Sequence, residues 1–233
     1  DELVKASNLK PNSIIASPWS RLQNSEKGWA SIDNNINRLP PDNDPILGWL
    51  NGWYYPPCSI LWPKKLFLEV VNKWDESLVV NQDGDIILRA LLNGAKLKII
   101  NKGEAFYRIQ EDDKISISKD VVSERALKSR MKVLKKVIIK LISLNQLNSY
   151  KDAIGIAYHK LARNNILSNP LLANECIVLS IEYGNNNISG TFWHKFITKM
   201  IGLKNKEKLA QTLYYMSLGN KKRNQFNKIK ELI

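Results

Sequence analysis

The sequence predicts an α/β region, formed by a partial mixed sheet with helices, followed by an all-α region. The first observation is charge: residues 1–119 contain 15 Lys or Arg and 15 Asp or Glu, whereas residues 120–233 contain 20 and 7. The second is pattern, because short apolar runs broken by Pro, Gly and Asn give way to long runs with a helical repeat. Both changes fall near residue 119 and predict two domains, 1–119 and 120–233.

Short apolar runs and turn residues predict the elements of the first domain. Residues 14–16 are apolar and include two β-branched isoleucines, as in a buried strand. Residues 20–45 are rich in Asn, Asp, Ser and Pro and predict an irregular loop. The remaining elements are expected in this order: a helix at 46–53, a strand at 58–62, helices at 64–72 and 82–93, and strands at 97–100 and 105–109 joined by a turn. These strands are too few for a complete doubly wound sheet.

Helical periodicity dominates the second domain. Apolar residues spaced alternately by four and three predict a helix whose basic residues lie mostly on other faces; the apolar series is Leu127, Met131, Leu134, Ile138 and Leu141. Further helices are expected at 150–165, 192–201 and 206–218. Another begins at Asn169-Pro170, with Asn as N-cap and Pro at the first helical position, and ends at Gly184.

Composition places the chain among ordinary globular proteins, with 44% hydrophobic and 24% charged residues. No apolar run approaches the ~18 residues of a transmembrane helix. Cys58 and Cys176 lie in apolar sequence, so we expect two buried, reduced thiols, as in a cytoplasmic protein. His159 and His194 lack nearby Cys or acidic partners in the sequence, and we expect no metal site from them.

The segment with the most chemical content is the start of the helix predicted at 82–93. Asp83 and Asp85 begin it, and Arg89 follows four residues after Asp85. Carboxylates at a helix N-terminus remain ionised, which suits a general base or a charge that orients a substrate hydroxyl. The alternative is an acidic helix start in which Asp85 and Arg89 form an i,i+4 pair worth about 0.3–0.5 kcal/mol. These residues alone favour the alternative.

The order of motifs around this segment adds a resemblance. They are Ile14-Ile15-Ala16, Pro56-Pro57-Cys58-Ser59-Ile60-Leu61-Trp62, Lys64-Lys65, Trp74-Asp75-Glu76, Gln82-Asp83-Gly84-Asp85, Gly94 and Phe106-Tyr107-Arg108. Over residues 14–108 this order resembles the C-terminal half of the catalytic domain of family 2 glycosyltransferases, which have the GT-A fold. Members carry a Gly-Gly-(Phe/Trp)-Asp-Glu turn and then Glu-Asp-x-Asp-Leu on a helix.

The resemblance implies an inverting enzyme that transfers a sugar from a nucleotide sugar to a hydroxyl of a glycan or lipid-linked acceptor. Asp83 would be the base, Asp85 would hold the helix start or an acceptor hydroxyl, and Arg89 would anchor Asp85 or the local loop. Two departures stand out. Residues 72–73 replace the two glycines, and Gln82 replaces the glutamate, which removes a negative charge beside Asp83.

Aromatic residues are dense just before this segment. A ring suits the apolar face of a sugar, although at least half of the tryptophans are expected to fill the core. The substrate-binding residues we expect are Trp53, Tyr54, Trp62, Trp74, Gln82 and Arg89.

In the family a nucleotide-binding half comes first, with an Asp-x-Asp motif that holds a divalent cation, Mg or Mn, against the diphosphate. We expect that half to lie outside this chain and take the chain to be a fragment that is inactive alone. The motif is accordingly expected to be absent before residue 83, so the resemblance implies the cation without its ligands.

Other interpretations stay open. The chain could be a non-catalytic module that binds a glycan or a protein through its aromatic cluster and basic helices, or an enzyme that has lost its activity. The basic helix at 125–141 could touch an anionic membrane, at the inner face of a cytoplasmic membrane, but a bundle helix with solvated lysines is favoured. Nucleic-acid binding is disfavoured because the basic half lacks a recognition motif.

Overall fold

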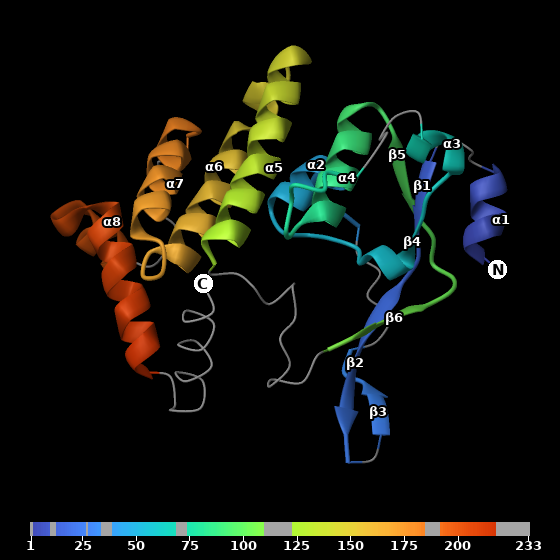
Figure 1. Cartoon of the computed structure of the whole chain (residues 1–233), viewed down its shortest axis with the longest axis horizontal. Coiled ribbons are helices and arrows are strands. Elements are labelled where there is room, and N and C mark those ends of the chain that lie inside the picture. Colours follow the sequence, from blue (N-terminus) through green and yellow to red (C-terminus); the bar gives the residue numbers. More distant parts are fainter. Residues whose placement is uncertain are drawn as a thin grey trace. The chain divides into compact units, whose positions relative to one another are not determined.

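The structure is a computed structural model that describes residues 2–9, 13–26, 28–33, 39–68, 74–109, 123–184 and 192–217 (Figure 1). The chain divides into two units, Asp1–Ser116 and Ile117–Ile233. The division lies close to the predicted boundary at residue 119. The described part of the first unit contains both strands and helices, and the described part of the second contains helices. The predicted mixture of α and β structure is confirmed.

A three-stranded mixed sheet lies at the centre of the first unit. β1 (Ser13–Ala16) pairs antiparallel with β4 (Ile60–Leu61) and parallel with β5 (Lys96–Ile99). All four residues of β1 are buried, as expected for a strand covered on both faces. In Figure 1, α1 (Glu2–Leu9) lies on one side of this sheet, and α2 (Pro45–Leu50) and α4 (Gln82–Leu92) lie on the other.

A second small sheet follows directly. β2 (Trp19–Ser25) pairs antiparallel with β3 (Gly28–Ser31) and parallel with β6 (Ala105–Arg108). The irregular loop predicted from residue 20 onward is therefore wrong in its first part, because backbone ladders form a largely exposed polar hairpin that has no apolar alternation to reveal it. The turn predicted between 97–100 and 105–109 also does not make a hairpin, since β5 and β6 belong to different sheets.

The remaining elements of the first unit are short. They are the 3₁₀ turns η1 (Pro41–Asn43) and η2 (Pro57–Ser59) and the helix α3 (Lys64–Leu66). The strand predicted at 58–62 shrinks to β4 because the two prolines before it start η2. Of the helix predicted at 64–72, residues 69–72 lie outside the described residues.

The apolar face of α4 packs onto the central sheet and so positions the helix. Its core partners include Ile14 of β1 and Leu66 of α3, and the helix contributes Ile86, Ile87, Ala90 and Leu91. Gly94 has φ +89° and follows the helix end, as predicted for a C′ glycine. The helix predicted at 82–93 is confirmed almost to the residue, since α4 spans Gln82–Leu92. The buried apolar side chains of α4 anchor the helix in the core.

The second unit contains α5 (Glu124–Ser143), α6 (Leu147–Asn165), α7 (Pro170–Glu182) and α8 (Phe192–Ser217). Gly202 has φ +78° and ψ +157° and breaks α8 into two pieces, which matches the two helices predicted there. The apolar stripe of α5 is largely buried, so α5 is a bundle helix with exposed lysines. In the described part of the chain, no helix is both long enough and apolar enough to cross a membrane.

The two cysteines differ. Cys176 of α7 is fully buried, and burial raises the pKa of its thiol to about 12. Cys58 is exposed, so the prediction that both are buried is wrong for this residue. The reason is local: Cys58 lies in η2 and not in a strand facing the core.

Candidate functional site

The first turn of α4 is tightly built. Asn81, just before the helix, has φ +64°, and its side chain lies over Gly84 so closely that a Cβ at Gly84 would collide with Asn81 Oδ1. Gln82 Nε2 donates a hydrogen bond of 2.9 Å to the carbonyl oxygen of Leu78. A glutamate carboxylate could not donate this bond. The amide at position 82 therefore ties the preceding loop to the helix start.

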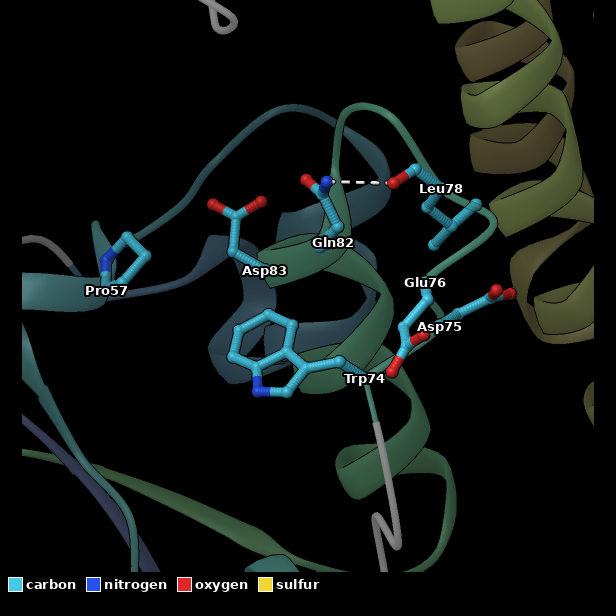
Figure 2. A pocket seen from close by; sticks show the side chains of 7 residues that line it. All are labelled: Pro57, Trp74, Asp75, Glu76, Leu78, Gln82 and Asp83. Atoms are coloured by element: carbon cyan, nitrogen blue, oxygen red, sulfur yellow. Dashed lines mark hydrogen bonds between the residues drawn. The ribbon is translucent and has the colours of Figure 1, made fainter.

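Beside this turn is a cavity of about 570 Å³ (Figure 2). It is lined by Pro57, Trp74, Asp75, Glu76, Leu78, Gln82 and Asp83. Figure 2 shows the Asp83 side chain leaving α4 on the side of Pro57, with the Trp74 ring on the same side of the helix. The half-buried Asp83 thus combines a position in the first turn of α4 with a side chain that lines an open hollow.

The two acids of the motif point to different places. Asp85 is only 1% exposed, and its Oδ2 accepts a hydrogen bond of 2.8 Å from Arg89 Nε; Nη2 of the same guanidinium forms an ion pair with that oxygen at 2.8 Å. This is the predicted i,i+4 pair, formed at the buried side of the helix. Asp85 and Arg89 do not line the cavity, and their arrangement is that of a pair that holds the helix.

Of the predicted aromatic contacts, only Trp74 lines the cavity. Trp53 packs in the core, with ring centroids 5.3 Å from Trp49 and 5.4 Å from Tyr55. Trp62 packs against Phe67 at 5.8 Å. Tyr54 is partly exposed, but it lies beside Trp19 at 5.5 Å and away from Asp83's cavity.

Four cavity residues were not predicted as site residues: Pro57, Asp75, Glu76 and Leu78. Asp75 Oδ1 accepts hydrogen bonds from the backbone N–H and the hydroxyl of Ser77, so it shapes the turn. Glu76 is exposed and adds a further carboxylate to the cavity, beside those of Asp75 and Asp83. The Trp74-Asp75-Glu76 run was the available signal, because its position in the family pattern places the whole turn next to the helix start.

The expected absence of Asp-x-Asp before residue 83 is wrong, since Asp42-Asn43-Asp44 has that spacing. These residues nevertheless do not fit a cation site. Asp44 Oδ1 accepts hydrogen bonds from the N–H groups of Ile46 (2.8 Å) and Leu47 (3.1 Å) and caps α2. The described residues contain no group of three His, Cys, Asp or Glu side chains arranged to hold a metal ion. Within the described ranges, the acidic side chains therefore offer no ready cation site.

Comparison with known proteins found no match, whether to a family model, to a curated protein or to a solved structure.

Proposed function

We propose that the first unit is the acceptor-binding part of an inverting glycosyltransferase with a GT-A-like fold, and that Asp83 is its base. One observation carries the proposal: Asp83 opens into a cavity beside Trp74, while Asp85, two residues on, is buried against Arg89. A general base needs an ionised carboxylate that a hydroxyl can reach. Of the two motif acids, Asp83 alone lies where a hydroxyl can reach it, because Asp85 is only 1% exposed.

In the proposed reaction, an acceptor hydroxyl donates a hydrogen bond to the Asp83 carboxylate. The hydroxyl oxygen attacks the anomeric carbon of the donor sugar as its proton passes to Asp83. The bond from that carbon to the diphosphate oxygen breaks in the same displacement, so the configuration at the anomeric carbon inverts. Asp83 afterwards releases the proton to water. The nucleotide sugar and the divalent cation of the family belong, in this proposal, to a donor-binding half outside this chain.

The cavity supplies what an acceptor sugar needs. The half-exposed indole of Trp74 offers a flat apolar surface to the C–H face of a pyranose. Glu76 can accept hydrogen bonds from hydroxyls at the sugar's edge. We assign Trp53 and Trp62 to the core. The acceptor class is a glycan or lipid-linked glycan of polysaccharide or cell-envelope synthesis, handled at the cytoplasmic side of a membrane.

Replacing Trp74 with alanine is expected to weaken glycan binding by about tenfold, the loss of roughly 1.4 kcal/mol of aromatic contact. Saturation-transfer NMR of this chain with a panel of glycans would identify a ligand, and a titration would measure its Kd. Trp29 of β3 supplies a matched control, since Trp29 and Trp74 are both 50% exposed and Trp29 lies outside the cavity. Equal losses in W74A and W29A would contradict the proposed site.

The competing function is a non-catalytic glycan-binding module that uses the same cavity. Both functions predict the same effect of W74A, but they predict different effects of a substitution at Asp83. A module needs no base, so Asp83→Asn would leave its biological output intact if binding is unchanged. The glycosyltransferase proposal requires the variant to bind the acceptor and fail to transfer.

A further inference from the structure

The first piece of α8, residues 192–201, exposes its large apolar side chains. Phe192, Trp193, Phe196 and Met200 are between 45% and 75% exposed, and we call them the aromatic patch. The three rings contact one another, with centroids separated by 5.8 Å (Phe192–Trp193), 6.4 Å (Phe192–Phe196) and 6.2 Å (Trp193–Phe196). The three rings therefore form one continuous apolar surface, and Met200 follows Phe196 one helical turn later.

The apolar residues of this helix face outward, which is the reverse of what is expected for a helix that only covers a core. At about 100° per residue, the four patch residues fall within an arc of roughly 100°. Thr198, on the opposite side of the helix, is buried. A surface helix normally buries its apolar stripe and exposes its polar residues. Here the polar threonine faces inward and the rings face outward.

Positive charge lies along one edge of the patch. Lys195 and Lys199 are exposed beside it, and Lys204 follows after the break at Gly202. The sequence from Phe192 to Asn205 contains no acidic residue. Aromatic rings flanked by lysines suit the interface of a bilayer with anionic lipids, because rings settle at headgroup depth and ammonium groups reach the phosphates.

We propose that the aromatic patch docks the second unit onto an anionic membrane surface. The proposal stands apart from the function proposed for the first unit. It commits to a lipid surface because an acidic protein partner would use the lysines but would gain little from three exposed rings. A neutral apolar partner would use the rings and leave the lysines without a role.

The membrane contact predicted for residues 125–141 of α5 is assigned instead to the aromatic patch of α8. The apolar stripe of α5 is turned into the unit, with Leu127, Val137 and Leu141 buried. The lysines of α5 can therefore add long-range attraction, but that stripe is not available to enter a bilayer.

Vesicle co-sedimentation of the full chain tests the proposal. Wild type is expected to bind vesicles with about 30% phosphatidylserine at least ~10-fold more tightly than pure phosphatidylcholine vesicles. Trp193→Glu should reduce binding to the anionic vesicles by about 10-fold or more. Leu171→Glu is the matched control, since Leu171 of α7 is 88% exposed and the change in charge is the same. Equal binding by W193E and wild type, or equal losses in both variants, would overturn the proposal.

A second pair of variants separates docking from general attraction. The double change Lys195→Glu and Lys199→Glu should weaken binding more than Lys132→Glu and Lys135→Glu in α5, although both change the net charge equally. Equal effects would mean that only overall charge matters and would overturn the proposal. Sedimentation velocity without lipid measures the oligomeric state. If wild type is a dimer and W193E is a monomer, a second copy covers the patch, contrary to the proposal.

Discussion

Asp83→Asn is expected to lower the rate of sugar transfer by the native protein about 10²–10⁴-fold, the range that general base catalysis contributes. The asparagine amide has nearly the same shape, so it can occupy the same place in the first turn of α4. It cannot accept a proton from the acceptor hydroxyl, and attack on the anomeric carbon loses its assistance. The measurement is kcat with saturating acceptor and donor, together with the acceptor's KM.

Two controls make that result specific. Glu76→Gln removes the exposed carboxylate of the same cavity and should mainly raise the acceptor's KM, because Glu76 is proposed to bind and not to take the proton. Asp44→Asn changes an acid that caps α2 and should leave kcat near wild type. A kcat for D83N within about threefold of wild type would remove Asp83 from the proposed role, because a general base contributes far more.

Glu207→Gln is expected to lower the free energy of unfolding of the second unit by about 3 kcal/mol at neutral pH. Glu207 is 1% exposed in α8 and accepts a hydrogen bond from Lys206, while His159 Nε2 of α6 lies 3.3 Å from Oε1 and Arg163 Nε lies 3.8 Å from Oε2. The amide leaves the nearly buried Lys206 ammonium without its counter-charge. Urea titrations followed by far-UV circular dichroism measure the loss.

The effect should depend on pH in a definite direction. Burial by itself raises the pKa of Glu207, but hydrogen bonds from His159 and Lys206 outweigh it and hold the pKa at about 2. Because this pKa is below the unfolded value of 4.5, the carboxylate's stabilisation is fully present above about pH 4.5 and is lost as pH falls toward 2. The difference between wild type and E207Q should shrink over that window. Glu182→Gln, at an exposed position of α7, is the control, and a pH-independent difference would contradict the account.

The sequence predicted α4 and the position of Asp83 and Asp85 in its first turn, because several local signals agree there. Acids at the start, a buried apolar series and Gly94 at the end all indicate the same helix. The hairpin of β2 and β3 was missed because it is largely exposed and polar, so its strands carry no alternating apolar pattern.

The roles of the aromatic residues could not be read from the sequence. A tryptophan that fills a core and one that faces a cavity look alike, and long-range packing decides between them. Trp53 is held in the core by Gly48, where a Cβ would lie 2.9 Å from the indole, whereas Trp74 lies half exposed beside Asp83. The outward aromatic patch of α8 was missed for the same reason, since periodicity gives a face but not the direction in which it points.

The most direct test of the account is the stereochemistry of transfer by the native protein. Wild type purified from its source would be incubated with a panel of nucleotide sugars and the glycan found to bind the Asp83 cavity. NMR would then report the anomeric configuration of the product. The account predicts transfer with inversion, which D83N abolishes. Transfer with retention, or no transfer from any nucleotide sugar by a protein that binds the glycan, would contradict it.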